Sequence, residues 1–151
     1  ASAGESFCDA GCGVGSLAIP LAQRGAMVSA SDISAAMVEE ATKRAASAGV
    51  SDTATFVTSD LESIEGEYDT VTCIDVMIHY PTEKMTDMVS HLAGLSDEKL
   101  LISFAPKVGP SPHGQQWKTE HNELFKARKL AWLVDRPNVE TEVIMVMSWS
   151  V

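Results

Sequence analysis

The sequence near the N-terminus reads Phe7-Cys8-Asp9-Ala10-Gly11-Cys12-Gly13-Val14-Gly15-Ser16, with three alternating glycines after a short apolar run. Glycine is needed where a backbone turns sharply and lies against a ligand, because a Cβ would stand in the way. The free N–H groups at the start of the helix that follows then face that ligand. The stretch therefore predicts the first strand, tight turn and helix start of a nucleotide-binding α/β unit.

The chain downstream alternates strand and helix patterns as far as residue 105. Pro20 lies past the first turn of the helix expected after the glycines, which predicts a short or kinked helix. A sequence of this kind predicts an α/β fold with a Rossmann-like, doubly wound, mostly parallel sheet and helices on both faces. The expected strands after the first are 26–32, 53–57, 68–76 and 99–105, and the expected helices are 15–23, 34–49 and one that Thr82 caps.

Composition narrows the class of protein. A chain of 151 residues with 45% hydrophobic residues is one globular domain by size, and no apolar run is long enough to form a transmembrane segment. The net charge of −10 argues against nucleic acid as a partner and favours a solvated acidic surface. Three cysteines, Cys8, Cys12 and Cys73, are an odd number without zinc-site spacing, so all three are expected to be reduced and no bound metal is expected.

Acidic residues follow successive expected strands. Asp32 ends the second strand, where a carboxylate accepts hydrogen bonds from the two ribose hydroxyls of a nucleotide; its alternative role is a helix cap or turn residue. Asp60 follows the third strand and is placed to accept a hydrogen bond from an adenine amino group, with Leu61 against the ring. A solvated loop acid is the alternative for Asp60. Asp75 comes at the end of the fourth strand, next to His79 and Tyr80 at the reaction edge of the sheet.

Two kinds of nucleotide site fit the glycine loop. Residues 13–18 fit the pattern of a dinucleotide site, and residues 9–15 fit the acid-x-G-x-G-x-G pattern of an S-adenosylmethionine site. Asp9 favours the second, because a carboxylate there can hold the ligand's ammonium group, directly or through water. Met37 belongs to the apolar face of its helix, where core packing is expected, and the helix start lies close to the ribose site. The candidate donor-binding residues are Asp9, Gly11, Gly13, Gly15, Asp32, Ile33, Met37, Asp60, Leu61 and Asp75.

Several longer runs resemble the magnesium-protoporphyrin IX O-methyltransferases of chlorophyll biosynthesis, a family of class I S-adenosylmethionine-dependent methyltransferases. The run from Ser29 to Met37 and the run Ile78-His79-Tyr80-Pro81 are much more specific than the glycine loop. The resemblance covers about residues 7–107. The full set of similar runs is 9–22, 28–38, 68–71, 78–81 and 102–107.

The resemblance implies methyl transfer from S-adenosylmethionine to a propionate carboxylate of magnesium-protoporphyrin IX. His79 is the residue expected to orient or hydrogen-bond that carboxylate, and Tyr80 is the second candidate. His79 has two alternative roles, axial contact with the porphyrin magnesium or a structural place in a turn. The resemblance further implies a magnesium chelatase subunit as a partner. It implies a location in the chloroplast, at the plastid membrane or in the stroma, or in the cytoplasm of a cyanobacterium.

The two ends depart from this pattern. The sequence has no initiator Met or targeting peptide and lacks the family's N-terminal arm, so it reads as truncated at that end. Residues 1–107 are expected to form the donor-binding core and 108–151 a divergent, atypical tail. Within the tail, Val143–Met147 is a candidate closing strand and 117–134 has a weak helical pattern with a basic cluster. Two other functions stay open, another small-molecule methyltransferase and a donor-binding fragment without catalytic activity.

Overall fold

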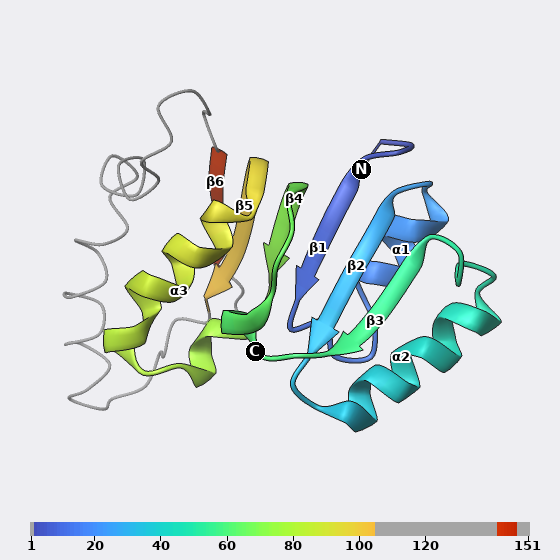
Figure 1. Ribbon diagram of the computed structural model, residues 1–151, viewed down its shortest axis with the longest axis horizontal. Helices are drawn as coiled ribbons and strands as arrows, with labels where there is room; N and C mark the ends of the chain where they lie inside the picture. The colour runs from blue at the N-terminus through green and yellow to red at the C-terminus, as the bar shows by residue number, and fades with distance from the viewer. Residues whose placement is uncertain (1, 105–141, 148–151) are drawn as a thin grey trace.

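The strands of the computed structural model, which describes residues 2–104 and 142–147, form one sheet in the order β3-β2-β1-β4-β5-β6 (Figure 1). All neighbouring strands run parallel. The predicted fold class is confirmed. The elements are β1 (Ser6–Ala10), α1 (Ala18–Gln23), β2 (Met27–Asp32), α2 (Ala35–Ser47), β3 (Ala54–Thr58), the short 3-10 helix η1 (Leu61–Ser63), β4 (Tyr68–Cys73), η2 (Met77–His79), α3 (Thr82–Gly94), β5 (Ser96–Phe104) and β6 (Glu142–Met147).

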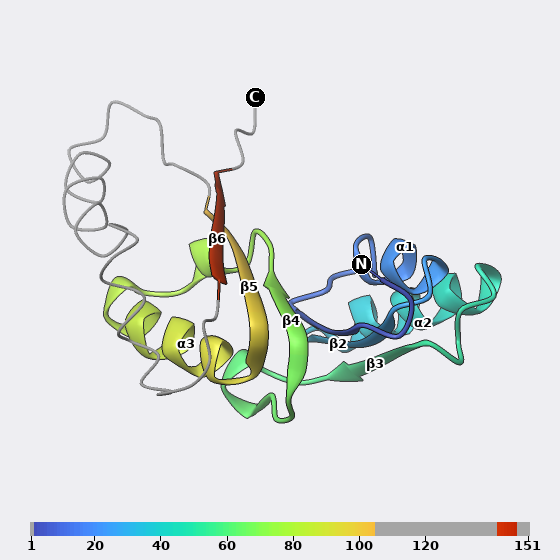
Figure 2. The same ribbon diagram turned by 90° about the horizontal axis from the view of Figure 1, so that it is seen from above.

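Helices cover both faces of this sheet (Figure 2). Helices α1 and α2 pack on one face and α3 packs on the other. Successive side chains of each strand point to opposite faces, so each strand contributes to both cores. On β1, Phe7 joins the buried cluster under α1 and α2, and Cys8 joins the cluster under α3. The chain reverses its direction of winding at β1, between β2 and β4. Ligands of open α/β sheets bind at such a switch point.

Helix α1 begins at Ala18, later than predicted. Pro20 consequently lies in the first turn, where a backbone N–H has no partner within a helix, so the proline removes no hydrogen bond. The expectation that Pro20 lies past the first turn is therefore wrong. The residues before Ala18 form turns that extend the glycine loop instead.

Two other expectations about local structure are wrong. Met37 is 44% exposed and does not pack in the core, since it lies in the first turn of α2, beyond the end of β2. Thr82 does not cap α3, because it is the first helical residue and Pro81 takes the N-cap position without a side-chain hydrogen bond. Ser34, by contrast, caps α2 as predicted, and its hydroxyl accepts a hydrogen bond from the Met37 N–H at 3.4 Å.

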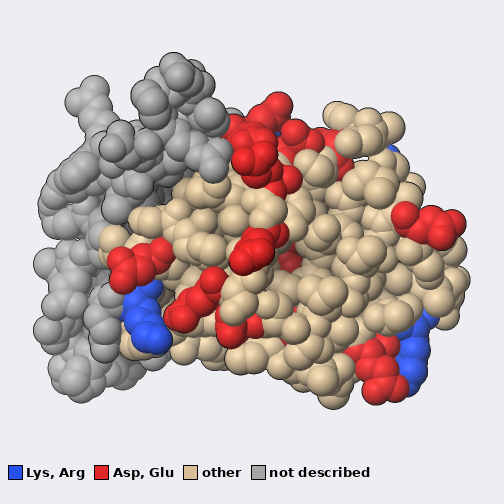
Figure 3. Space-filling model, viewed as in Figure 1, with Lys and Arg blue, Asp and Glu red and all other residues tan. Residues whose placement is uncertain are grey.

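The far edge of the sheet is formed by β6, which pairs in parallel with β5 from Lys99–Glu142 to Phe104–Met147. A strand is thus present where the sequence predicts one at 143–147. The weak helical pattern at 117–134 and its basic cluster lie outside the described residues, and the division at residue 107 stays a prediction. None of the helices among the described residues has the length and apolar character that crossing a membrane requires. Acidic side chains dominate the charged surface seen in Figure 3.

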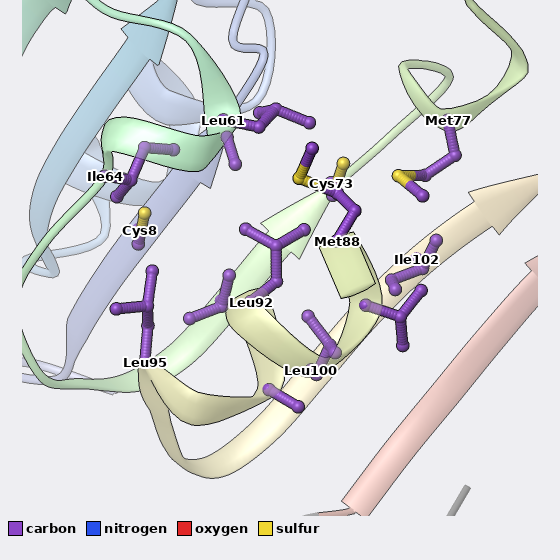
Figure 4. Close-up of a cluster of buried hydrophobic side chains, with 14 of the residues drawn as sticks. Cys8, Leu61, Ile64, Cys73, Met77, Met88, Leu92, Leu95, Leu100 and Ile102 are labelled. Atoms are coloured by element: carbon purple, nitrogen blue, oxygen red, sulfur yellow. The ribbon is translucent and has the colours of Figure 1, made fainter. Parts of the chain in front are cut away.

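All three cysteines are free thiols, as predicted, and all three are buried. Cys8 and Cys73 lie among the apolar side chains under α3 (Figure 4). Burial is the main reason that the pKa of each thiol, that of Cys12 included, rises to about 12. Because the thiolate is the nucleophile, the native protein should react with iodoacetamide at pH 8 at least about 100-fold more slowly than a free cysteine.

Intact-mass spectrometry measures this reaction. We expect no added mass in the native protein and three carbamidomethyl groups after denaturation. Modification of the native chain at the rate of the denatured chain would contradict the burial of these thiols.

Candidate functional site

A cavity of about 540 Å³ opens at the carboxyl ends of the strands around the switch point. This volume is in the range of sites for small-molecule ligands. Of the candidate residues, all but Asp9 and Gly15 line it. They are Gly11, Gly13, Asp32, Ile33, Met37, Asp60, Leu61, Asp75, His79 and Tyr80. The topology thus brings together residues that are far apart in the sequence.

The glycine loop is tied to β2 and open toward the cavity. The N–H groups of Gly11 and Cys12 both donate to the Ser31 carbonyl oxygen at 2.8 Å. Gly13 has a φ of +52°, and no heavy atom lies within 4 Å of the place where its Cβ would be. A ligand can therefore lie directly against the backbone at Gly13. Gly15 does not line the cavity. The space beside its Cα is filled by Ile19 and Phe56, which a Cβ would meet at 3.1–3.3 Å.

Asp32 joins the glycine loop to the start of α2. Its Oδ2 accepts a hydrogen bond from the Gly13 N–H at 2.8 Å, and its Oδ1 accepts one from the Ser34 N–H at 2.9 Å. A carboxylate has about four acceptor positions, so each oxygen can accept a further hydrogen bond from a ligand hydroxyl. The turn role and the ligand role predicted for Asp32 are therefore compatible in one geometry.

Asp60 and Leu61 form the wall of the cavity next to β3. The Asp60 Oδ1 accepts a hydrogen bond from the Ser63 N–H at 2.8 Å as the N-cap of η1, and this bonding lowers the pKa of the carboxyl group. Leu61 is only 4% exposed and presents an apolar surface beside that carboxylate. The pair offers one acceptor and one flat apolar contact.

Asp75 has an unusual backbone, with a φ of +58° just after β4. Its N–H donates to Ser103 Oγ at 2.7 Å, and the Ser103 hydroxyl donates to Asp75 Oδ1 at 2.8 Å. Strained residues of this kind cluster at functional sites, where surrounding contacts hold them in place. Ser103 is a supporting residue that sequence reasoning missed, and its polarity within the buried strand β5 was the available signal.

His79 and Tyr80 lie at the rim of the cavity, where the short helix η2 ends. The His79 N–H donates to the Val76 carbonyl oxygen at 3.0 Å, and the His79 side chain is exposed. Partial burial, reinforced by nearby Cys73, Glu62 and Asp60, raises the pKa of Tyr80. Tyr80 therefore keeps its phenolic proton at neutral pH and can donate a hydrogen bond.

Asp9 lies at the end of β1, 3% exposed and outside the cavity lining. The Thr72 hydroxyl donates to its Oδ1 at 2.8 Å, whereas its Oδ2 has no hydrogen-bond partner. Burial raises the pKa of Asp9 to about 6, and the charge of Asp32 adds to this effect. The Thr72 hydroxyl and the Ala18 amide act in the opposite direction.

Sequence reasoning missed four cavity residues that flank the predicted ones. These four residues are small or apolar and carry no charge, whereas charge was the signal that drew attention to the acids beside them. The missed residues are Ser34, Ser59, Ile74 and Val76.

Across residues 2–104 and 142–147, no group of three or more His, Cys, Asp or Glu side chains is arranged to hold a metal ion.

Comparison with known families identifies the domain. The family described as a methyltransferase domain matches residues 7–97, which is more than half of the chain. The chain belongs to this methyltransferase family. The matched residues include the glycine loop, and β1 to α3 in full except for Ser6 at the start of β1.

Two curated relatives of this methyltransferase chain share more than half of their aligned residues with it. A magnesium-protoporphyrin O-methyltransferase of Synechocystis sp. is 58% identical over 106 residues, which cover 70% of this chain and 46% of the relative. A chloroplastic magnesium protoporphyrin IX methyltransferase of Arabidopsis thaliana is 56% identical over 107 residues, which cover 70% of this chain and 34% of the relative. The chain therefore spans less than half the length of these curated relatives.

A solved structure gives the same relationship. The crystal structure of the magnesium protoporphyrin IX methyltransferase from Synechocystis, with bound S-adenosylmethionine, superposes with a TM-score of 0.67 at 50% sequence identity. The alignment covers 80% of this methyltransferase chain and 59% of the solved one.

Proposed function

We propose that the methyltransferase chain binds S-adenosylmethionine in the cavity at the switch point. The residues present fit this group. Gly13 is open to a ligand, Asp32 has free acceptor positions for ribose hydroxyls, and Asp60 has one for the adenine amino group. The solved relative that shares 50% identity carries the same donor, which supports the assignment.

The exposed apolar residues of the cavity support the same proposal. Ile33 is 74% exposed and Met37 is 44% exposed, although both are large hydrophobic residues. Both line the cavity, together with buried Leu61. A nucleoside bound between them would cover apolar surface that otherwise faces water. We assign these three side chains to the adenosine, Asp75 to the donor as well, and Asp9 to its ammonium group.

We infer that the reaction is methyl transfer to a propionate carboxylate of magnesium-protoporphyrin IX, giving the monomethyl ester in chlorophyll biosynthesis. The observation that carries this inference is the identity of 58% and 56% with two enzymes of that name. The aligned length, 106 and 107 residues, is about the length of the described part of the chain.

The residues at the rim position the acceptor in this proposal. The bound donor supplies an electrophilic sulfonium methyl group. A propionate is ionised at neutral pH, so no strong base is required, and the main contribution of the protein is to hold the carboxylate oxygen in line. His79 hydrogen-bonds that carboxylate from the end of η2, and Tyr80 donates a second hydrogen bond from the same rim.

The proposal extends to partners and location. A magnesium chelatase subunit would deliver the porphyrin, because it makes the metallated substrate. The Arabidopsis relative is named chloroplastic and the Synechocystis relative is bacterial, which supports a chloroplast or a cyanobacterial cytoplasm as the location.

Transfer of a labelled methyl group in the intact protein tests the function. We expect labelled ester with magnesium-protoporphyrin IX and none with a panel of phenol, amine and simple carboxylate acceptors. Transfer to another acceptor alone would establish a different small-molecule methyltransferase. Donor binding in calorimetry without transfer to any acceptor would establish a binding fragment.

Substitution of His79 separates acceptor positioning from donor binding. His79→Ala should lower kcat by about 10²-fold, since a misplaced carboxylate loses most of its alignment with the methyl group. Affinity for S-adenosylhomocysteine should stay within about twofold of the wild type, because the adenosine contacts are on other residues. Steady-state kinetics and calorimetry measure the two quantities.

His91 provides a control, and because it is half-buried on α3 whereas His79 is exposed, its variant is first checked for folding by circular dichroism. His91 lies on α3 away from the cavity lining, so His91→Ala should leave kcat nearly unchanged. Unaltered turnover in His79→Ala would remove His79 from the mechanism.

A further inference from the structure

Thr72 and Asp9 form a buried pair in which one proton faces two acceptors. The Thr72 hydroxyl lies 2.8 Å from Asp9 Oδ1 and 3.2 Å from the Cys8 carbonyl oxygen. A hydroxyl has one proton and donates it to one acceptor at a time. If Asp9 is protonated at Oδ1, both contacts are satisfied, because Asp9 donates to Thr72 and Thr72 donates to Cys8.

The surroundings of Asp9 favour this protonated form. Asp9 is 3% exposed, and its Oδ2 has no hydrogen-bond partner, which is costly for an ionised carboxylate and outweighs the opposite effect of the Ala18 amide. Asp32 faces it from β2 with a second negative charge. The remaining titratable groups around it are thiols, close enough that the charge of Asp9 raises the pKa of each. They are Cys8, Cys12 and Cys73.

The cavity and Asp9 are electrostatically connected. Asp32 is part of the cavity wall, and its charge acts on Asp9 through the protein. A cation bound in the cavity beside Asp32 would act on Asp9 with the opposite sign. An opposite charge within about 4–6 Å lowers the pKa of a carboxyl group by about 1–3 units.

We propose that in mildly acidic solution Asp9 carries a proton before the donor binds, and that the cationic donor expels this proton while Thr72 holds the resulting carboxylate in position. The proposal rests on the binding of S-adenosylmethionine proposed above. In this step the O–H bond of Asp9 breaks, the proton passes to solvent, and the Thr72 hydroxyl turns from the Cys8 carbonyl to Asp9 Oδ1. Thr72 is thus a positioning residue that acts through Asp9.

Calorimetry in two buffers with different ionisation enthalpies counts the protons released. The probe is S-adenosylhomocysteine, which carries the ammonium group and is chemically stable. With a free-protein pKa of about 6, binding should release about half a proton at pH 6 and about a tenth at pH 7. Asp9→Asn should abolish this release, since an amide has no proton to lose in this range.

Three threonine variants test the role of Thr72. Thr72→Val removes the hydroxyl that lowers the pKa of Asp9, so release at pH 7 should rise to several times the wild-type value. Thr72→Ser should restore the wild-type value. Thr70→Val is the control, because Thr70 is equally buried on β4 and bonds Glu5 instead, at 3.1 Å. It should leave proton release unchanged.

The outcomes separate this proposal from the proposed function. Binding of S-adenosylhomocysteine without a difference in proton release between wild type and Asp9→Asn at pH 6 overturns the proton proposal alone. Equal release in Thr72→Val and Thr70→Val overturns the role of Thr72. Absence of binding at both pH values overturns donor binding itself, and the proton proposal with it.

Discussion

Asp32→Ala should weaken the binding of S-adenosylhomocysteine by about 100-fold or more. The substitution removes the two proposed hydrogen bonds to ribose hydroxyls, each worth about 1.5–3 kcal/mol for a charged acceptor. It also leaves the N–H groups of Gly13 and Ser34 without their acceptor, so the glycine loop is no longer fixed against the start of α2. Isothermal titration calorimetry measures the dissociation constant.

Two further variants make this experiment decisive. Asp32→Asn keeps the shape of the side chain but turns one oxygen into an N–H₂ group that faces a backbone donor. Its affinity for S-adenosylhomocysteine should therefore lie between those of the wild type and Asp32→Ala. Asp52→Ala removes an exposed acid from the turn before β3, at the amino ends of the strands and away from the cavity. It should change the affinity by less than twofold. Wild-type affinity in Asp32→Ala would show that the ribose assignment is wrong.

Gly11→Ala should lower the free energy of unfolding by about 2–5 kcal/mol. Gly11 has a φ of +81°, which costs an L-residue about 1–2 kcal/mol. In addition, its new Cβ would lie 2.3 Å from Val76 Cγ2, and such an overlap costs about 1–3 kcal/mol. Urea denaturation followed by circular dichroism measures the change.

Two variants divide this cost into its parts. In a Val76→Ala background the overlap with the two Cγ atoms disappears and only a contact with Cβ at 3.2 Å remains, so Gly11→Ala should cost little more than the part due to φ. Gly13→Ala has φ strain but open space around the new methyl group, so it should cost about 1 kcal/mol in stability. The same methyl group faces the cavity and should lower the affinity for the donor. Equal destabilisation by Gly11→Ala in both backgrounds would contradict the proposed overlap.

Proton linkage at Asp9 and the loss of alignment in His79→Ala concern different halves of the proposed function. Asp9, outside the cavity lining, is proposed to act on the donor, and His79, within the lining, is proposed to act on the acceptor. A defect in donor binding should leave acceptor positioning intact, and a defect in acceptor positioning should leave donor binding intact. The full set of variants can therefore show which half of the proposed function this chain performs.

The three acids that line the cavity were predictable from sequence because each lies at or just after the end of a strand. In a parallel sheet all carboxyl ends meet at one edge, so Asp32, Asp60 and Asp75 had to be near each other once the strands were recognised. Asp75 lines the cavity, although it lies two residues beyond Cys73, where β4 ends, and not within the expected strand 68–76. Its left-handed backbone has no signal in the sequence, because Ser103 supplies the contacts that hold it.

Burial was predicted less well, since it depends on which elements cover which surface. Met37 has helical spacing with buried alanines, but the sheet does not extend beneath the first turn of α2. Gly15 belongs to the glycine pattern, but Ile19 and Phe56 occupy the space on its side that a ligand would need. Asp9 was assigned to a ligand, and its burial with Thr72 could not be deduced before β1 and β4 were paired.

The sequence by itself determined the βαβ order, the glycine loop and the acids at the strand ends, because these follow from local backbone requirements and hydrophobic period. Only the tertiary structure decided which of these residues hydrogen-bond to each other, which side chains pack against them and which are exposed. Thr72 meets Asp9, and Val76 fills the space beside Gly11, across two adjacent parallel strands and the loop that follows them. Such contacts depend on pairing between residues more than sixty positions apart, which no local pattern encodes.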